Sequence, residues 1–455
     1  MYRFLSIALF SLVFWQACGP QPNSTASNTT ASTSPAASAS AAPTATPELP
    51  PTPAPTPALT GADAELWAKA MKIHQSSIVI DTHNDVTSAI LDDGFDLGEN
   101  GIVNGRIKTH TDIARLKTGG MGAQFFAVYV GKEFVNKKAE EGGGAARRAM
   151  DMIDVVYDQV KKHPDTFEMA YTADDIRRIR KSGKIAALMG IEGGHAIEDS
   201  LHALRNFYRL GIRYMTLTHT NTNSWADSEA DLKKPDVKHH GGLSDFGKQV
   251  VLEMNRLGMM VDISHVADDT MADVFEVSKA PVIASHSSAR AIAAHTRNLN
   301  DDELRAIAKN GGVVMVNFYD GFIDPKKAEV TFNGRAKEEE LKQKYPNDPK
   351  RVADEMKQWR AQYKFDKTPL SVLMDHIEHI IKVAGIDHVG FGADLDGIPL
   401  DAAPVGAEDV SKYPVITFEL LKRGHSEADI KKILGENLLR AMARCEQVAK
   451  EMPKM

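Results

Sequence analysis

The stretch Ile185-Ala-Ala-Leu-Met-Gly-Ile-Glu192 is an unbroken apolar run that ends on a single acidic residue. Such a run is typical of a parallel strand that is covered on both faces. Seven further short runs rich in apolar and β-branched residues are predicted as strands, at Ser77–His83, Ala123–Val130, Tyr214–His219, Met259–His265, Pro281–His286, Gly312–Phe318 and His388–Asp394. Helical patterns fill the gaps between them. Eight strands alternating with helices predict an α/β fold, a (β/α)₈ TIM-type barrel rather than an open doubly wound sheet.

The first 18 residues differ in composition from the rest of the chain. Arg3 precedes an apolar run from Phe4 to Trp15, which is too short to span a bilayer and is typical of a signal-peptide core. Ala17-Cys18-Gly19 resembles the lipobox of bacterial lipoproteins, so we expect Cys18 to be lipidated and the protein to be exported to the cell envelope. Plain secretion with cleavage nearby is the alternative.

Residues 19–60 consist almost entirely of Pro, Ser, Thr, Ala and Asn, and predict a disordered tether between the anchor and the barrel domain of residues 61–455. Within that domain, a charged insertion at about 324–368 predicts helices near 337–345 and 350–363. Its charge is most simply a solvated face, and a lid or oligomer contact is the alternative. The segment Asp375-His-Ile-Glu-His379 is assigned to the solvated surface of an outer helix.

Composition excludes some classes of function. The formal net charge of −7 offers no basic surplus for neutralising phosphates, so nucleic-acid binding is not expected. Neither G-x-G-x-x-G nor the complete phosphate loop G-x-x-x-x-G-K-[ST] occurs, because Gln249 follows the partial match at 242–248, which removes the main argument for a nucleotide site. Cys445 is the only cysteine besides Cys18. With Cys18 lipidated it has no partner, so we expect a small buried thiol.

Six polar residues stand at the last positions of six predicted strands. Barrel enzymes build their sites from the C-terminal strand ends and the loops that follow. One such histidine would be unremarkable, but six polar residues at six strand ends are hard to attribute to packing. They are His83, Glu192, His219, His265, His286 and Asp394.

The residue types in this set point to metal chemistry. His83 and Asp85 lie two apart on an extended segment, so their side chains can converge on one ion. Imidazole nitrogen and carboxylate oxygen are ligands that suit zinc. Adding Glu192, His265 and His286 gives five candidate ligands, more than one catalytic zinc takes from protein. The count favours two metal ions that share a bridging carboxylate.

Several short motifs occur in order along the folded part of the chain and together resemble the renal (membrane) dipeptidase family of zinc peptidases, a branch of the amidohydrolase-like barrels. They are Asp81-Thr-His-Asn-Asp85, Ile191-Glu-Gly-Gly-His195, Tyr214-Met-Thr-Leu-Thr-His219, Asp262-Ile-Ser-His265, Ser285-His-Ser-Ser288, Arg297-Asn298, Val316-Asn-Phe-Tyr319 and Gly392-Ala-Asp-Leu-Asp-Gly397. The similarity spans roughly residues 65–445.

The resemblance implies a role for each site residue. His83 and Asp85 would hold one zinc, His265 and His286 the second, and Glu192 would bridge the two ions. His219 would lie near the scissile carbonyl, Arg297 would hold the substrate carboxylate, and Asp394 would be the acid beside the bridging water. Asp396 is the weaker candidate for that last role. The family further implies a homodimer.

The sequence thus predicts a zinc-dependent dipeptidase of the metal-dependent hydrolase kind, with two Zn²⁺ per chain. It would hydrolyse free dipeptides by attack of a metal-bridging hydroxide, and the resemblance implies tolerance of a C-terminal D-residue. One alternative is a sibling binuclear amidohydrolase acting on another amide, ester or lactam. A non-catalytic peptide-binding lipoprotein is a more remote alternative, because the ligand set is complete.

Overall fold

The computed structural model describes residues 60–103 and 106–453. The predicted signal peptide, the lipidation site at Cys18 and nearly all of the predicted tether lie outside these described residues. Within the described part of the chain, no helix combines the length and the apolar composition that a membrane span requires.

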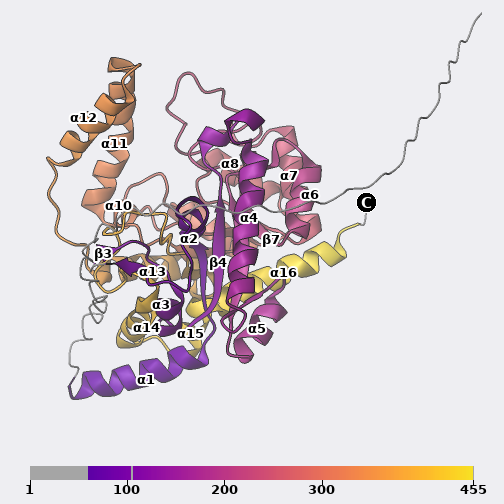
Figure 1. The fold of residues 1–455 in the computed structure, drawn as a ribbon. Coiled ribbons are helices and arrows are strands. Elements are labelled where there is room, and N and C mark those ends of the chain that lie inside the picture. The colour runs from indigo at the N-terminus through magenta and orange to yellow at the C-terminus, as the bar shows by residue number, and fades with distance from the viewer. Residues whose placement is uncertain (1–59, 104–105, 454–455) are drawn as a thin grey trace, which may run out of the picture. The chain divides into compact units, whose positions relative to one another are not determined.

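Eight parallel strands form a closed barrel and follow one another around it in chain order. Figure 1 shows the helices that lie around these strands. Closure comes from β4, which pairs with both β1 and β6, and from β11, which returns to pair with β1. All eight predicted strands are therefore confirmed. They are β1 (Val79–Asn84), β4 (Met121–Tyr129), β6 (Ile185–Glu192), β7 (Ile212–Thr216), β8 (Met260–Asp262), β9 (Val282–Ala284), β10 (Val313–Val316) and β11 (Val389–Phe391).

Helices surround the barrel strands, and several begin at caps that the sequence encodes. Thr172 and Asn300 each form a capping box, and Ser426 accepts a hydrogen bond from the Asp429 N–H as its position predicts. The helices are α1 (Ala62–Ser76), α2 (Val86–Asp93), α3 (Ile113–Thr118), α4 (Ala145–Lys162), α5 (Ala173–Lys181), α6 (Leu201–Arg209), α7 (Asp245–Leu257), α8 (Asp268–Val277), α9 (Asp301–Asn310), α13 (Leu370–Ala384), α14 (Tyr413–Lys422), α15 (Glu427–Lys431) and α16 (Asn437–Glu451). Three short strands lie outside the ring: β2 (Ile102–Val103) and β3 (Arg106–Ile107) pair with each other, and β5 (Phe167–Met169) pairs with β6.

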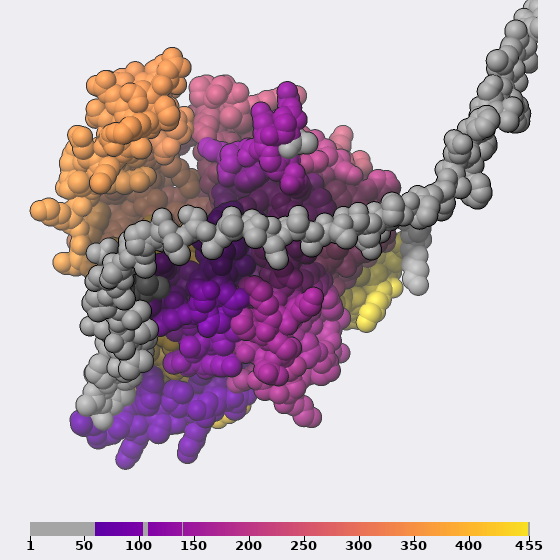
Figure 2. All heavy atoms as spheres, in the orientation of Figure 1, coloured from indigo at the N-terminus to yellow at the C-terminus, as the bar shows by residue number. Residues whose placement is uncertain are grey.

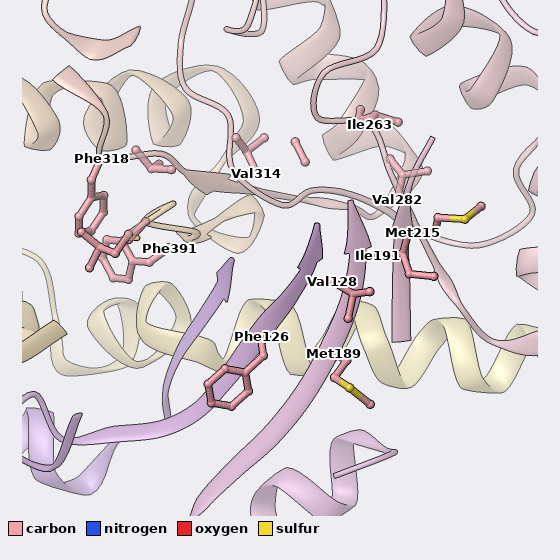
Figure 3. Close-up of a cluster of buried hydrophobic side chains, with 14 of the residues drawn as sticks. Phe126, Val128, Met189, Ile191, Met215, Ile263, Val282, Val314, Phe318 and Phe391 are labelled. Atoms are coloured by element: carbon pink, nitrogen blue, oxygen red, sulfur yellow. The ribbon is translucent and has the colours of Figure 1, made fainter. Parts of the chain in front are cut away.

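The apolar runs are long because both faces of each strand are buried. One set of strand residues, including Phe126, Met189 and Val314, packs beneath the outer helices (Figure 3). The alternate set, including Phe125, Leu188 and Met315, packs with side chains from α5 and α16, among them the buried thiol of Cys445. Every barrel strand thus loses the polar alternation that would mark a half-exposed strand.

Alternation along β6 directs its final residue into the barrel. Gly190 pairs with Tyr214 on β7, and the missing side chain leaves room for the Tyr214 ring. The Tyr214 hydroxyl reaches His83 on β1, although β4 and β6 separate these two strands in the ring, so this face is the barrel interior. Glu192 lies two residues beyond Gly190 and therefore points to the same side.

The charged insertion forms a helical hairpin, coloured orange in Figures 1 and 2. It consists of α11 (Pro325–Lys344) and α12 (Pro349–Arg360), and it follows the short α10 (Asp320–Ile323). The prediction that the first helix begins near Lys337 was wrong. Asp324 caps α11 at the Lys326 N–H and Pro325 occupies its first turn, so the helix starts directly after α10.

The assignment of the segment 375–379 to the solvated surface was wrong for His376. His376 is completely buried. Its Nδ1 accepts a hydrogen bond from the Ala289 N–H at 3.0 Å, and its Nε2 lies 2.9 Å from the Ile323 carbonyl oxygen. The residue lies on the face of α13 that packs against the barrel, where it ties the loop after β9 to α10.

We expect Gly190→Ala to destabilise the barrel by about 1–3 kcal/mol, because the added methyl group overlaps the fully buried Tyr214 ring. Chemical denaturation measures this free energy of unfolding. The double variant Gly190→Ala/Tyr214→Leu should cost less than the sum of the two single substitutions. Strict additivity would show that the ring and the glycine do not depend on each other.

Candidate active site

Of the six predicted strand-end residues, only His83 and Glu192 lie within strands. His219, His265, His286 and Asp394 lie in the loops that follow β7, β8, β9 and β11. The apolar sequence runs extend beyond the observed strands because the first residues of these loops are also buried. The backbone nevertheless leaves the ladder, and His265 and Asp394 adopt positive φ angles of 66° and 62°. A non-glycine residue seldom adopts this conformation, and such residues cluster at functional sites.

The structure brings all five predicted metal ligands together around the Glu192 carboxylate. Its Oε1 lies 3.0 Å from His265 Nε2 and 3.2 Å from His286 Nε2. Its Oε2 lies 3.5 Å from His83 Nε2, which is in turn 3.2 Å from Asp85 Oδ2. Each oxygen of one carboxylate therefore faces a separate pair of ligand atoms.

Tyr214 fixes the tautomer of His83. The Tyr214 hydroxyl donates to the Thr82 carbonyl oxygen at 2.9 Å and lies 2.8 Å from His83 Nδ1. Because the hydroxyl proton goes to the carbonyl, Nδ1 must donate its own proton to the Tyr214 oxygen. The lone pair of His83 is then on Nε2, the atom that faces Asp85 and Glu192.

A second relay fixes His286 in the same way. The Ser285 hydroxyl donates to Asp262 Oδ2 at 2.6 Å, so its oxygen accepts from His286 Nδ1 at 2.8 Å. The free lone pair of His286 is again on Nε2. Asp262 is itself held by the N–H groups of Ser264 and Ser285. Both histidines therefore present a basic nitrogen to Glu192.

Burial sets the charge states in this cluster. It lowers the pKa of His265 and His286 well below the ordinary value, so both imidazoles are neutral at pH 7. Burial raises the pKa of Glu192, but the surrounding histidines outweigh it and hold that pKa well below the ordinary value. Neutral His265 and His286 beside an ionised carboxylate have the protonation states that metal ligation requires. Burial also opposes the charge on His83, but Tyr214 and the neighbouring carboxylates hold its pKa well above the ordinary value, so His83 would release a proton on binding a metal.

These residues fit a metal centre by the chemistry of their donor atoms. His83 Nε2 and Asp85 Oδ2 are buried and have no hydrogen-bond partner among the described residues. His265 Nε2 and His286 Nε2 lie only 2.9 Å apart, and the tautomer of His286 leaves no proton on its nitrogen. Several lone pairs thus converge where few protons are available to satisfy them, and a cation resolves that conflict. Nitrogen and oxygen donors of this kind suit zinc.

His219 and Asp394 lie beside the ligands. His219 Nε2 is 3.7 Å from Glu192 Oε1, and burial lowers the pKa of His219 to about 4. Asp394 shares a possible ligand group with His83 and His286, accepts a hydrogen bond from Asn317 Nδ2 at 2.8 Å, and has its pKa raised to about 8 by burial. Gly397 is required here, because a Cβ would collide with the carboxylates of Asp85 and Asp394.

Hydrogen bonds to the segment that carries His286 hold the Arg297 side chain close to the cluster. Its Nη2 donates to the His286 carbonyl oxygen at 3.1 Å and its Nη1 to Ser287 Oγ at 3.2 Å. The guanidinium lies over the Phe322 ring, 5.4 Å from the ring centroid, and its Nε is buried with no hydrogen-bond partner in the described part of the chain. The predicted carboxylate-binding residue therefore lies next to the cluster, although Phe322 and not Arg297 lines the cavity there.

A cavity of about 430 Å³ opens over the cluster and lies within the size range of small-molecule sites. Ligand residues and both proposed catalytic residues line its inner end. Aromatic, apolar and small polar side chains line the rest, together with the carboxylate of Asp396 and one arginine. The lining residues are Asp85, Ser88, Tyr129, Glu192, His219, Thr220, His265, Tyr319, Phe322, Arg335, Asp394, Asp396, Gly397, Ile398 and Pro399.

Comparison with known families agrees with this geometry. The sequence model described as membrane dipeptidase (Peptidase family M19) matches residues 67–455, nearly all of the described chain. The chain belongs to this family. Its fold is accordingly the (β/α)₈ barrel of a metallo-dipeptidase, and the family is zinc-dependent.

Solved structures give the same fold. The probable dipeptidase PvdM from Pseudomonas aeruginosa is 25% identical, with a TM-score of 0.69, over 85% of this chain and 99% of that chain. A metallopeptidase from Rhodobacter sphaeroides, liganded with a phosphinate mimic of the dipeptide L-Ala-D-Ala, is 25% identical. Its TM-score is 0.64, over 81% of this chain and 99% of that chain. A further M19 metallopeptidase, dipeptidase AC, is 26% identical, with a TM-score of 0.65 over 81% of this chain and 98% of that chain.

Sequence reasoning did not single out the residues that orient the ligands. Tyr214 and Ser285 lie within the quoted motifs, but nothing in their spacing shows which histidine each contacts. Asn317 and Arg335 were missed as well. The one local signal was Gly190, since a glycine inside an apolar strand often marks a close approach of another group.

We expect Tyr214→Phe to lower zinc affinity about 10- to 100-fold, because His83 loses the partner that fixes its tautomer. Competition with a chromophoric chelator measures the affinity. Tyr157→Phe is the control, since that hydroxyl is exposed and its hydrogen-bond partners are the Tyr171 hydroxyl and the Leu210 carbonyl oxygen, neither of which belongs to a proposed ligand. Equal zinc affinity in the wild type and Tyr214→Phe would refute the orienting role.

Proposed function

We propose that this metallo-dipeptidase hydrolyses free dipeptides at a centre of two zinc ions. The observation that carries the proposal is the position of Glu192, whose two carboxylate oxygens each face a different pair of ligand atoms. A carboxylate in this position can share two cations. His83 and Asp85 would hold one ion, and His265 and His286 the other.

When bound, the two ions would supply the Lewis acidity that makes a water nucleophilic near neutral pH and polarises the substrate carbonyl. The protein contributes orientation and proton transfer. His219 lines the cavity beside Glu192 and is neutral at pH 7, so it can offer an N–H to the carbonyl oxygen as negative charge develops there. Loss of one such donor typically lowers turnover about 10²- to 10³-fold.

Asp394 is the proposed proton carrier. Its Oδ2 is engaged by Asn317, and its other oxygen lies near Asp85 at the inner end of the cavity. His83 and His286, which belong to the two different ligand pairs, both lie within reach of this carboxylate. Cations held by these ligands would offset the burial that raises the pKa of Asp394, so that its carboxylate can take a proton from the attacking water and pass it to the leaving amine. Asp396 also lines the cavity, but its Oδ1 accepts from the His110 N–H.

Arg297 is the proposed partner of the substrate's C-terminal carboxylate. A guanidinium whose position is fixed by two hydrogen bonds can bind a carboxylate in a forked geometry. An anchor one residue beyond the scissile bond would exclude longer peptides. The complex of the Rhodobacter relative with an L-Ala-D-Ala mimic supports extending the proposal to a C-terminal D-residue.

The purified chain should contain about two zinc ions and hydrolyse L-Ala-L-Ala and L-Ala-D-Ala, but neither L-Ala-L-Ala-L-Ala nor an amidated dipeptide. Amino-acid release and metal analysis on one sample measure both properties. Chelation should abolish the activity and added zinc should restore it. Zinc-loaded protein that ignores every free dipeptide would contradict the proposal and favour a sibling amidohydrolase acting on another amide, ester or lactam.

We also propose that the protein is exported and held at the bacterial membrane by lipid on Cys18, on the basis of the lipobox-like sequence. Cys18→Ser should then move the protein from the detergent phase to the aqueous phase in a phase-partition assay, while Cys445→Ser should not. Aqueous partition of the unaltered chain would contradict lipidation. The homodimer implied by the resemblance stays a prediction, which sedimentation of the same preparation tests.

A further inference from the structure

Arg335, on the charged insertion, is the only lysine or arginine among the residues that line the cavity. Helix α11 carries it there: Ala328 is buried on the same helix, and Thr331 lies close to Gly321 and the Tyr319 ring. Residues 328, 331 and 335 follow the three- and four-residue spacing of one helical face. Packing of that helical face against the barrel domain therefore brings Arg335 to the cavity wall.

Arg335 keeps most of its hydrogen-bonding capacity free. Its Nη1 donates to Glu229 Oε2 at 2.7 Å, the only hydrogen bond the guanidinium makes among the described residues, and its side chain is 32% exposed. A guanidinium has five N–H donors in a planar fork. The remaining donors can bind a carboxylate that enters the cavity.

Glu229 links Arg335 to the proposed carboxylate anchor. Its side chain is almost fully buried, and Oε2 also accepts from the hydroxyl of Thr296, the residue before Arg297. Its pKa is lowered, although burial acts the other way, chiefly because Arg335 and Arg297 both lie nearby. Two guanidinium groups thus flank one buried carboxylate, with Arg335 on the insertion and Arg297 beside the metal ligand His286.

We propose that Arg335 binds the side-chain carboxylate of an acidic C-terminal residue, so that the enzyme prefers dipeptides ending in glutamate or aspartate. This inference rests on the proposed function, in which Arg297 holds the main-chain carboxylate of that residue. A residue with two carboxylates can engage both guanidinium groups. A neutral residue engages one and leaves the donors of Arg335 unmatched.

The test compares L-Ala-L-Glu with L-Ala-L-Gln, which have nearly the same size and differ in charge. The wild type should show a kcat/KM ratio of about 10 to 100 in favour of the glutamate peptide, as for a charge-assisted hydrogen-bonded pair. Arg335→Gln should reduce the ratio to about 1, mainly through the glutamate substrate. Arg335→Lys should fall between the two, because it retains the charge and loses the fork.

Lys337→Gln is the matched control. It removes one positive charge from the same helix at a side chain that pairs with Glu340 and does not line the cavity, so the wild-type ratio should persist. The reversed peptides L-Glu-L-Ala and L-Gln-L-Ala should not respond to Arg335→Gln. Calorimetric titration with L-glutamate and L-glutamine makes the comparison without turnover, and thermal unfolding of each variant reports whether the fold is intact.

Two results would overturn the inference. The first is a wild-type ratio near 1. The second is an equal loss with both peptides in Arg335→Gln, which would mean that Arg335 supports the fold or binds the main-chain carboxylate. Failure of the wild type to hydrolyse any free dipeptide would instead refute the proposed function, so the two failures are distinguishable.

Discussion

The buried carboxylate of Glu192 is the constraint that organises the C-terminal end of this barrel. An ionised carboxylate inside a protein is strongly unfavourable unless compensating groups surround it. Here His265, His286 and His83 surround it with nitrogen donors that can hold a compensating cation, and each comes from a different strand or from the loop after one. Only the closed ring brings these elements to one point. The fold and the site therefore depend on each other: the strands position the side chains around Glu192, and its buried carboxylate requires a compensating positive charge there.

A second set of residues, which contact the histidines but not the proposed metal ions, holds this arrangement in place. Tyr214 connects β7 to β1 across the barrel interior, and the Asp262–Ser285 relay connects the loops that carry His265 and His286. These contacts leave the Nε2 lone pairs of His83 and His286 facing Glu192. The absence of a side chain at Gly190 makes the Tyr214 connection possible. Ligand orientation thus depends on packing inside the barrel as much as on the ligands themselves.

The insertion shows how a member of this family can alter its substrate cavity while the barrel is preserved. Arg335 and Phe322 both belong to the segment after β10, and they add a cation and an apolar wall to a site whose inner end is rich in carboxylates. Because the insertion contributes no metal ligand, it can change without disturbing the metal centre. Substrate preference and catalysis are then carried by separate parts of the chain.

The sequence by itself predicted the barrel, which the structure confirms, and the candidate ligands, which the structure brings together. Unbroken apolar runs indicate strands that are buried on both faces. Polar residues at the ends of these runs indicate the C-terminal end of the barrel, where active sites lie. The tertiary structure alone decided where the strands end, which partner fixes each histidine, why His376 is buried, and that Arg335 reaches the cavity. The physical reason is that local pattern reports burial and periodicity along one segment. Contacts such as Tyr214 with His83, or Arg335 with Glu229, join residues more than 100 positions apart, and their formation depends on the closure of the ring.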